Sequence, residues 1–509
     1  MSAFGDPSRP GKGTAKEGRT HTCLWAYFGS AYLAVLVTPL VIWLARRIGA
    51  VDRPGVRSIH TRPTPRIGGV AIYLSFMCII VPLLFLNNTM GRTFREVQLQ
   101  VITLLCCASA VFVIGLIDDL RGLPARFKFM AELFGAGALC LAGVRISDIG
   151  FGAGAAVHLG WLGGPITLLW IVGITNAVNL SDGLDGLAAG IAAITCAVIA
   201  AFALQGTMIH SGAARNNDVM MALFALALLG SLSGFLFFNF NPAKVFMGDC
   251  GSLFLGFSLA AASVMCVSKS MALVGLALPA LALGIPIFDT IFSMLRRFLE
   301  RRSLFAPDRS HFHHRLLDLG LRHRHAVMAI YLATLLAAGL GLLMMVSQNA
   351  GSLVVFGGVL LLILLLFRVV GVVELHTTIA RLQDRYTYAR HRHEEQKVFE
   401  DLQLEFRQAH DAGQWWQAIC AAARTMDFAW VSLKTTHADG RVEEELWRTP
   451  NAQPDLHTLV ILNVPVRDAA PGRTVNLELA IARNGSLEAA GRRATLFARL
   501  LDENVTVGR

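Results

Sequence analysis

Carboxylates are scarce in the first 370 residues, and several of them cluster in three short segments. This part of the chain holds 16 Asp and Glu, of which five lie in these segments. They are Asp118 and Asp119 in GLIDDLRG, Asp182 and Asp185 in NAVNLSDGLDGLAAG, and Asp249 in NPAKVFMGDCGS. Mg²⁺ prefers oxygen ligands and usually shares one or two carboxylates with substrate phosphates. A carboxylate pair beside a metal can also orient a nucleophile. The three segments therefore favour metal-assisted chemistry on a phosphate.

These acids have two other interpretations, solvated surface charge and a transport pathway. Acids in a single loop are most often solvated surface charge, but three segments on one side of a membrane indicate a site. Acids within a membrane also line transport pathways, so a secondary transporter with an Asp-lined path is the alternative function. Such a transporter predicts inverted repeats and broken midplane helices. The sequence shows no repeat, and these acids lie at loop ends, which favours an enzyme.

A fourth segment, RRFLERRSLFAPDRSHFHHRL, combines arginines with three histidines in four residues. Its histidines are His311, His313 and His314, and Arg309 precedes them. Three histidines could bind zinc, but a fourth ligand and a nearby Cys are missing. Arg and His facing a pyrophosphate would be as natural. Asp289, inside an apolar run after Pro286, is either an ion-pair partner for a nearby Arg or a functional group.

The elements that must position these residues are membrane helices. Hydrophobic residues make up 54% of the 509 residues and charged residues 16%, against roughly 25% in soluble domains. This composition excludes a soluble globular enzyme and a disordered scaffold. Apolar runs recur at lengths that can cross a roughly 30 Å hydrocarbon core. Eleven spans are predicted: 24–45, 67–86, 98–117, 128–144, 160–176, 184–205, 219–238, 252–268, 271–295, 326–347 and 351–370.

The loop charges predict the orientation of these spans. The loops after odd-numbered spans carry 18 Lys and Arg, and those after even-numbered spans carry five. The positive-inside rule then places the odd-numbered loops, all the acidic segments and the C-terminal tail in the cytoplasm. The net charge of +10 belongs to the apolar part, because residues 371–509 hold 17 Lys and Arg against 19 Asp and Glu. We therefore expect contact with membrane lipid and anionic substrates, and no nucleic acid.

The chain divides into four predicted parts. Residues 1–22 are polar and predict a disordered lead-in, and residues 23–370 form the transmembrane domain. Residues 371–417 carry charges of both signs at helical spacing and predict a cytoplasmic linker helix, which could pair with a second copy as a homodimer. Residues 418–509 predict a small α+β domain, loosely resembling a GAF fold by element order. The predicted fold class is thus an all-α polytopic membrane protein of about eleven transmembrane helices with a C-terminal cytoplasmic α+β domain.

Five ordered motifs together resemble the polyprenyl-phosphate N-acetylhexosamine-1-phosphate transferase family, glycosyltransferase family 4. The motifs are HTRPTPRIGG, GLIDDLRG, NAVNLSDGLDGLAAG, FNFNPAKVFMGDCGS and PDRSHFHHRL, within residues 24–370. The resemblance implies a protein of the bacterial inner membrane with a cytoplasmic active site. It implies transfer of a sugar-1-phosphate from a UDP-N-acetylhexosamine to undecaprenyl phosphate, with release of UMP. The HFHH segment is similar to the GlcNAc-1-phosphate transferase branch, so GlcNAc-1-phosphate is the expected group.

The resemblance also implies roles for the motif residues. Asp249 would be the principal ligand of Mg²⁺, with Mn²⁺ as an alternative ion, and Asp182 would support the metal. Asp118 and Asp119 would be catalytic and face the lipid phosphate, which Lys128 would bind. The nucleotide and sugar would contact Asn179, Asp185, Asn239, Phe246, Arg309, His311, His313 and His314. Among these, Asn239 and Phe246 would hold the uracil, and the Arg and His residues would contact the sugar-pyrophosphate end.

Simple electrostatics agrees with these implied roles. The attacking phosphate is already charged, so a strong general base is not obviously needed. The main barrier is the approach of one anion to another, which a metal, Lys128 and the Arg/His loop would offset. We therefore expect loss of the metal to be more damaging than loss of either Asp118 or Asp119.

Overall fold

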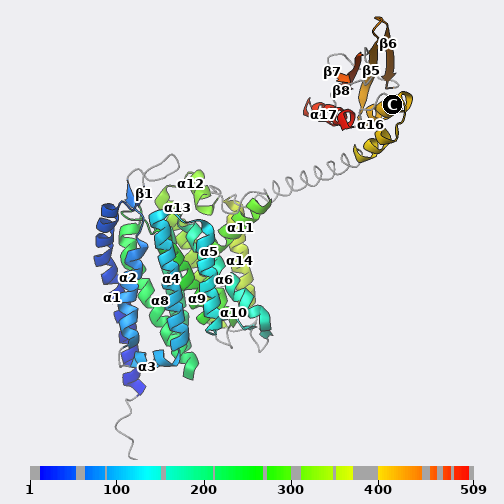
Figure 1. The fold of residues 1–509 in the computed structure, drawn as a ribbon. Helices are drawn as coiled ribbons and strands as arrows, with labels where there is room; N and C mark the ends of the chain where they lie inside the picture. The colour runs from blue at the N-terminus through cyan, green and yellow to red at the C-terminus, as the bar shows by residue number, and fades with distance from the viewer. Residues whose placement is uncertain are drawn as a thin grey trace, which may run out of the picture. The chain divides into compact units, whose positions relative to one another are not determined.

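The structure is a computed structural model, and two compact units make up the chain. The units are Met1–Leu375 and His376–Arg509, and Figure 1 shows the elements of each. The described residues are 12–52, 63–85, 89–150, 156–209, 212–266, 272–299, 311–347, 351–370, 399–449, 459–466, 474–482 and 487–503.

The first unit is a bundle of helices joined by short loops. Its helices are α1 (Lys12–Ile48), α2 (Gly69–Phe85), α3 (Thr89–Glu96), α4 (Gln98–Arg121), α5 (Ala125–Leu141), α6 (Gly163–Ser181), α7 (Leu187–Ile209), α8 (Gly212–Asn239), α9 (Gly248–Met265), α10 (Ala272–Ala282), α11 (Gly284–Leu299), α12 (Phe312–Asp318), α13 (His323–Ser347) and α14 (Gly351–Val369). Two small antiparallel pairs, β1 (Val51–Asp52) with β2 (Thr64–Pro65) and β3 (Asp148–Gly150) with β4 (Ala156–His158), lie in its loops. A 3-10 turn, Gly160–Leu162, precedes α6.

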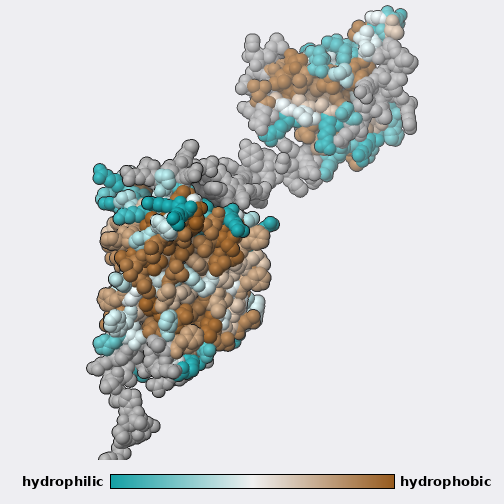
Figure 2. Space-filling model, turned by 60° about the vertical axis from the view of Figure 1, so that its left-hand side comes forward, coloured by the Kyte–Doolittle hydropathy of each residue, from teal (hydrophilic) through white to brown (hydrophobic). Residues whose placement is uncertain are grey.

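Apolar side chains form a band across this unit, with polar side chains gathered toward its ends (Figure 2). Within the described residues, seven helices are long and apolar enough to cross a membrane, and two shorter apolar helices accompany them. The unit is therefore that of a multi-pass membrane protein. The number of eleven spans predicted from the sequence is not confirmed.

Two sequence predictions for this unit are corrected by the structure. The predicted ninth span, 271–295, is two helices, α10 and α11, which meet at Leu283. Pro286 explains the break, because it has no N–H to bond the carbonyl of Ala282 and its ring clashes with that carbonyl. The lead-in predicted to be disordered is helical from Lys12, since the good helix formers Ala15, Lys16 and Glu17 extend α1. Residues 1–11 lie outside the described part.

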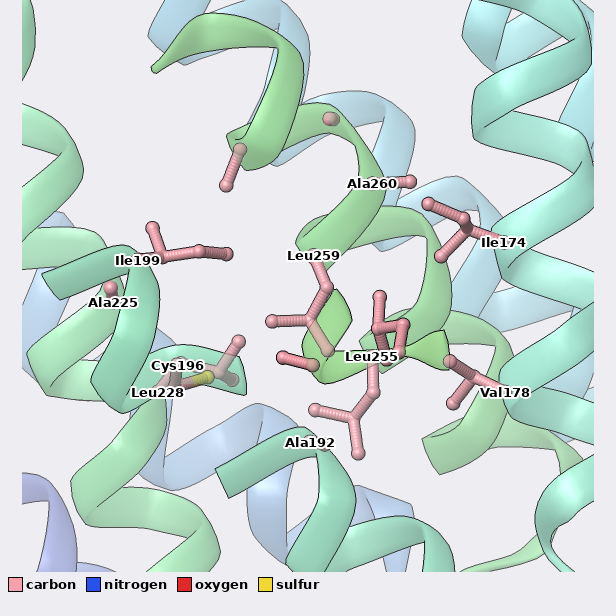
Figure 3. Packing of buried hydrophobic residues seen from close by; sticks show 14 of the residues in the cluster. Ile174, Val178, Ala192, Cys196, Ile199, Ala225, Leu228, Leu255, Leu259 and Ala260 are labelled. Atoms are coloured by element: carbon pink, nitrogen blue, oxygen red, sulfur yellow. The ribbon is translucent and has the colours of Figure 1, made fainter. Parts of the chain in front are cut away.

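The helix α9 runs through the centre of the bundle. All its residues from Cys250 to Met265 are buried, as expected for a helix that is apolar on every side. Figure 3 shows Leu255 and Leu259 of α9 among side chains of α6, α7 and α8. At roughly 25 cal/mol per Å² of buried apolar surface, this packing fixes α9 firmly. The N-terminus of α9, which carries Asp249, is therefore held in place by the whole core.

The second unit is a four-stranded antiparallel sheet with helices. Its strands are β5 (Phe428–Thr436), β6 (Val442–Arg448), β7 (Leu459–Val466) and β8 (Thr474–Ala482), in the order β6-β5-β8-β7, and its helices include α16 (Ala412–Thr425) and α17 (Leu487–Glu503). Alternate strand residues such as Val431, Leu477 and Leu479 share a core with Ile419 and Phe497 of the two helices. The predicted α+β character of this region is confirmed. Residues 399–408 are helical, while the rest of the predicted linker helix up to 398 lies outside the described residues.

Candidate active site

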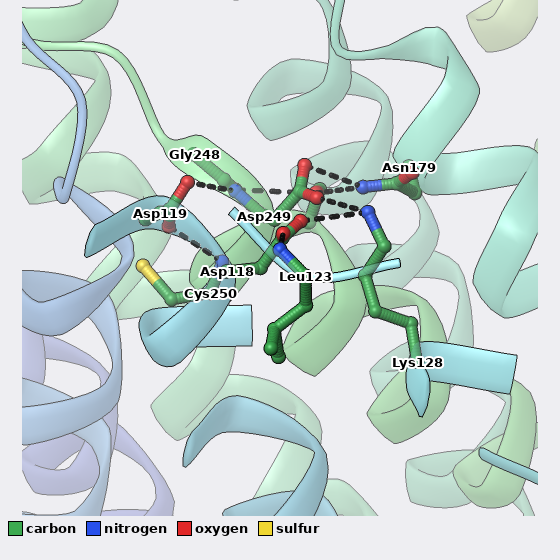
Figure 4. A network of polar contacts seen from close by, with 9 residues as sticks. Asp118, Asp119, Leu123, Lys128, Asn179, Gly248, Asp249 and Cys250 are labelled. Atoms are coloured by element: carbon green, nitrogen blue, oxygen red, sulfur yellow. Dashed lines mark hydrogen bonds and ion pairs between the residues drawn. The ribbon is translucent and has the colours of Figure 1, made fainter. Parts of the chain in front are cut away.

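The acidic segments meet at one end of the bundle, which we call the site end. It is formed by the C-terminal ends of α4 and α6 and by the N-terminus of α9, near β1 and α12 in Figure 1. The central contact is an ammonium between two carboxylates. Lys128 Nζ lies 2.7 Å from Asp118 Oδ2 and 2.6 Å from Asp249 Oδ2 (Figure 4). Two carboxylates 131 positions apart in the sequence, Asp118 and Asp249, thus share one cation.

The chain fixes this arrangement through neighbouring donors. Asp118 Oδ1 accepts a hydrogen bond from the backbone N–H of Leu123, in the turn after α4. Asn179 on α6 donates from Nδ2 to Asp249 Oδ1 at 3.1 Å and to Ser252 Oγ at 2.8 Å. Asp118, Asp249 and Lys128 therefore have little freedom to rotate away from one another.

Asp119 contacts different groups from its neighbour Asp118. Its Oδ1 accepts from the backbone N–H of Asp249 at 3.0 Å, and its Oδ2 accepts from that of Cys250 at 2.9 Å. These are free N–H groups of the first turn of α9, where a carboxylate is stabilised by hydrogen bonds and by the helix dipole. Asp119 is buried and both its oxygens are occupied. Asp119 thus holds the first turn of α9 against α4, and the catalytic role predicted for it from the sequence remains a prediction.

The glycines at the RIGG end of the first motif contact the segment that leads into α9. Gly68 and Gly69 donate backbone hydrogen bonds to the carbonyls of Phe246 and Met247 at 2.9 and 2.7 Å. Gly248 has φ +75°, and a Cβ there would collide with the Arg66 carbonyl and the Asp119 carboxylate. Only glycine satisfies both conditions. The backbone of α9's first turn is thus held by the segment preceding α2 and by α4.

Asp182 lies directly after α6, beside the cluster. Its carboxylate makes no hydrogen bond or ion pair with any other residue that the structure describes. Although the side chain is only half-buried, loss of surrounding water and the negative charges of Asp249, Asp119 and Asp185 raise the pKa of Asp182 to about 8. Burial is the largest cause, and the neighbouring carboxylates add to it, so a cation bound beside Asp182 would favour its ionised form.

Asp185 and Asn239 hold the loop that leads into α9. Asp185 Oδ2 accepts from Asn241 Nδ2 at 2.9 Å and from the Ala243 backbone N–H at 3.0 Å. The buried Asn239 donates to the Val245 carbonyl at 2.9 Å. These contacts brace the loop, so the predicted nucleotide contacts of Asp185 and Asn239 remain predictions. Phe246 is half-buried in the same loop, and its stacking on uracil also remains a prediction.

The histidine segment is anchored by Asp289 of α11. Asp289 Oδ2 lies 3.1 Å from His311 Nδ1, and Oδ1 accepts from the Phe312 backbone N–H at 2.8 Å. Burial, and then the charges of the neighbouring histidines His314, His311 and His323, lower the pKa of His313 to about 3, so His313 is neutral near pH 7. Arg309 lies outside the described residues.

The histidines reach the acidic segments through a glycine. A Cβ on Gly183 would collide with Nε2 of His313, so the absence of a side chain lets this ring pack against the loop that carries Asp182. His313 also stacks against His311 and His314, with ring centroids 5.7 and 4.4 Å apart. The structure therefore brings the described part of the histidine segment, from His311 onward, to the site end. The sequence predicts a common site for this segment and the acidic segments.

The donor set fits a divalent cation that shares its coordination with phosphate. Among the described residues, no group of three or more His, Cys, Asp and Glu side chains forms a ready metal cage. Asp118 and Asp249 nevertheless face one point, which the ammonium of Lys128 takes, so this point already stabilises positive charge. Mg²⁺ commonly uses only one or two protein carboxylates together with substrate phosphates.

Two residues of this region were missed by the sequence analysis. Glu132 lies one helical turn after Lys128 on α5 and is buried. Its Oε2 accepts from Nδ2 of Asn176, one turn before Asn179 on α6, and its Oε1 has no hydrogen-bond partner among the described residues. The second missed residue is Asn176. The available signals were that Glu132 lies four residues after Lys128 and that Asn176 lies three residues before Asn179, so each shares a helix face with a site residue.

A helix bundle that gathers carboxylates, a shared lysine and histidines at one end defines a multi-pass membrane enzyme acting on anionic groups. Sequence comparison gives the family. The model of glycosyl transferase family 4 matches residues 101–267, which contain the three acidic segments. One relative is 40% identical to this chain over 80% of the relative's own length. The chain therefore belongs to glycosyl transferase family 4.

Three relatives illustrate the similarity. The chain is 40% identical over 309 residues to a probable undecaprenyl-phosphate N-acetylglucosaminyl 1-phosphate transferase of Bacillus subtilis, a match that covers 60% of this chain and 80% of that protein. It is 38% identical over 322 residues to a decaprenyl-phosphate N-acetylglucosaminephosphotransferase of Mycobacterium leprae, covering 60% and 79%. It is 35% identical over 253 residues to a phospho-N-acetylmuramoyl-pentapeptide-transferase of Geobacillus kaustophilus, covering 46% and 72%.

Proposed function

We propose that this protein transfers N-acetylglucosamine-1-phosphate from UDP-N-acetylglucosamine to undecaprenyl phosphate and releases UMP. Membership in glycosyl transferase family 4 supports the reaction class. The similarity to two N-acetylglucosamine phosphate transferases, at higher identity and coverage than to the pentapeptide transferase described above, supports the sugar. The product would be a lipid-linked sugar that starts a surface glycan.

The reaction is a phosphoryl transfer between two anions. An oxygen of the lipid phosphate forms a bond to the phosphorus that carries the sugar, and the bridging P–O bond to the other phosphorus breaks. The electron pair of that bond leaves on UMP. No oxidant or further reactant is required. Catalysis then consists of alignment and of stabilising negative charge at the attacking and leaving oxygens.

Lys128 is the residue we assign to the lipid phosphate. Its ammonium already bridges two carboxylates at the site end, so a phosphate that displaces one of them keeps the same kind of contact. Asp118 would take part directly, because it lies beside Lys128, whereas Asp119 would hold the first turn of α9 in place. Asn179 would hold Asp249 from the opposite side.

Asp249 and Asp182 would hold the divalent cation, with Mg²⁺ the expected ion. When bound, the ion would offset the charge of the pyrophosphate and of the departing UMP. The unpaired carboxylate of Asp182 and its raised pKa support this assignment. Asp185, Asn239 and the loop they brace would form the floor of the nucleotide site, with Phe246 against the uracil.

We propose that the site end faces the cytoplasm of a bacterial inner membrane, where UDP-sugars are made. The excess of Lys and Arg in the loops after odd-numbered spans supports this orientation. The C-terminal α+β unit would lie on the same side and would serve as a docking or dimerisation module. The first of these proposals is tested by accessibility of single cysteines placed in the loops on each side of the membrane.

The observation that carries the proposed function is the convergence of Asp118, Lys128 and Asp249 at one end of an apolar bundle of this family. The test is UMP release by the purified full-length protein in detergent, with undecaprenyl phosphate, Mg²⁺ and a panel of UDP-sugars. We expect release with UDP-N-acetylglucosamine that depends on the lipid and is lost in Asp249→Asn. Asp318→Asn, an exposed charge change on α12, serves as the matched control.

Folded protein that releases no UMP with any sugar would overturn the proposal. The transporter considered from the sequence is not supported by any of the relatives described above. Release of UMP with UDP-N-acetylgalactosamine alone would keep the reaction class but change the sugar.

A further inference from the structure

Asp289 is a buried acid in the membrane unit that the proposed reaction does not use. It lies in the first half of α11, directly after the break at Leu283, and only 4% of its surface is exposed. Both its oxygens have partners: Oδ1 accepts from the backbone N–H of Phe312, and Oδ2 faces Nδ1 of His311 at 3.1 Å. A lone carboxylate in this position is costly unless such hydrogen bonds compensate it.

The contact of Asp289 with Nδ1 of His311 bears on which ring nitrogen carries hydrogen. An ionised carboxylate only accepts hydrogen bonds, so the nitrogen facing it, Nδ1, must be the donor. Nε2 is then the nitrogen available to another group. Nε2 of His311 makes no hydrogen bond with any other residue in the described part of the chain.

The ring of His311 is also linked to the acidic cluster. It stacks parallel to the ring of His313, with centroids 5.7 Å apart and an interplanar angle of 4°. His313 in turn packs on Gly183, which follows Asp182. A fixed chain of contacts therefore runs from Asp289 on α11 to the loop where we place the metal and nucleotide.

We propose that Asp289 is a positioning residue that holds His311 as the Nδ1–H tautomer and so offers Nε2 to the sugar-pyrophosphate of the substrate. This inference rests on the proposed function, because it assigns a further residue to the same site. The carboxylate acts through the imidazole and does not touch the substrate. The hydrogen bond to Phe312 keeps the start of α12 in register while the second oxygen orients the ring.

A purely structural clamp predicts a different response to mutation, which a double-mutant cycle separates. The variants are Asp289→Asn, His311→Gln and the double variant, with Asp318→Asn as the control on the same short helix. Asn keeps an oxygen for the Phe312 N–H but removes the negative charge from Nδ1. The measurements are kcat and KM for the UDP-sugar, together with thermal unfolding of each protein in detergent.

We expect Asp289→Asn to lower kcat by about 10- to 100-fold, the usual cost of losing the carboxylate that orients a functional imidazole. KM should change little, and Asp318→Asn should match the parent protein. The double variant should be no slower than His311→Gln alone, because Asp289 then has nothing left to orient. Losses that multiply in the double variant, or full activity of His311→Gln, would overturn the inference while leaving the proposed function intact.

A second measurement does not depend on turnover or on a mutant that folds with difficulty. In protein labelled with ¹⁵N-histidine, the His311 signals are assigned by their absence in His311→Gln. We expect Nδ1 to be protonated in the full-length parent protein at pH 7. An unprotonated Nδ1 beside Asp289 would overturn the inference even if the enzyme proves inactive toward every sugar tested.

Discussion

Within the described residues, a lysine lies between two carboxylates in each of the two units. In the membrane unit, Lys128 contacts Asp118 and Asp249 at 2.7 and 2.6 Å, and 21% of its side chain is exposed. In the C-terminal sheet, Lys434 lies 3.7 Å from Glu444 and 3.2 Å from Glu478, and 43% of its side chain is exposed. The residue types are the same, but the surroundings and the distances differ.

The difference shows why one of these ion pairs can act on a bound anion and the other cannot. The partners of Lys434 are neighbours across strands β5, β6 and β8, and water remains close to all three groups. Exposed pairs of this kind gain little, because water and salt screen them. The partners of Lys128 come from helices α4 and α9, and the surrounding protein holds them close together. Charges that the protein holds at fixed positions, with only partial access to water, act more strongly on any anion that enters.

The largest expected effect, a loss of kcat, comes from removing the half-buried ammonium of Lys128. Lys128→Met should lower kcat by about 10²- to 10³-fold, the usual loss when one preorganised group that stabilises transferring charge is removed. The reason is that the lipid phosphate loses its positive partner while Asp118 and Asp249 remain. The measurement is UMP release at saturating UDP-sugar. Arg126→Gln, an exposed charge removal two residues earlier on α5, should leave kcat unchanged.

The same variant should also show the electrostatic cost in stability. Without Lys128 the two carboxylates face each other, which should lower the free energy of unfolding by about 2 kcal/mol, less than for a fully buried pair. Added Mg²⁺ should recover part of this loss, more than it stabilises the parent protein. Equal stabilisation of both proteins by Mg²⁺ would argue that the ion binds away from Asp118 and Asp249.

Burial of His313 should make the stability of the protein depend on pH. Since the pKa of His313 is lowered to about 3, the folded protein stays unprotonated there while the unfolded chain binds a proton below about pH 6.5. Stability is therefore complete above that pH and falls as pH drops from 6.5 toward 3. At pH 4.5 the loss should be about 3 kcal/mol. Thermal unfolding of His313→Gln should show a weaker pH dependence over this window, and an unchanged slope would assign the acid sensitivity to other groups.

Asp119 tests whether neighbours in sequence share a function. Asp119→Asn replaces one accepting oxygen at the start of α9 by an NH₂ group and removes a charge from a helix N-terminus. We expect the free energy of unfolding to fall by about 1 to 2 kcal/mol. Asp118→Asn should instead lower kcat with little change in thermal unfolding. The opposite pattern, with Asp119→Asn stable but inactive, would restore the catalytic role predicted from the sequence.

The motif residues and their common location could be predicted from the sequence because few acids tolerate an apolar chain. Asp118, Asp182 and Asp249 were identified for that reason, and the loop charges placed them on one side. The sequence could not separate Asp118 from Asp119, since consecutive helical residues point in different directions. That separation depends on which of them meets the first turn of α9, a contact over 130 residues.

The fold was predictable as far as hydropathy carries information. Most apolar runs are helices, but the count of eleven spans is not confirmed, and the run at 271–295, which contains Pro286, forms two helices. Glu132 was overlooked because its hydrogen-bond partner is distant in the sequence. Its partner Asn176 lies on the next helix, 44 residues away, and only packing of α5 on α6 brings them together.

The smallest expected effect belongs to Lys434, the exposed counterpart of Lys128. Lys434→Gln removes a cation from between two carboxylates, as Lys128→Met does, and Glu444 keeps its 2.6 Å hydrogen bond from Ser432. We expect no measurable change in kcat, and any shift in thermal unfolding should disappear at high salt because exposed charges are screened. The effects of Lys128→Met should weaken less at high salt, because the protein holds Asp118 and Asp249 close together at a partly enclosed site. A salt-independent loss in Lys434→Gln comparable to that of Lys128→Met would mean that burial is not what distinguishes the two lysines.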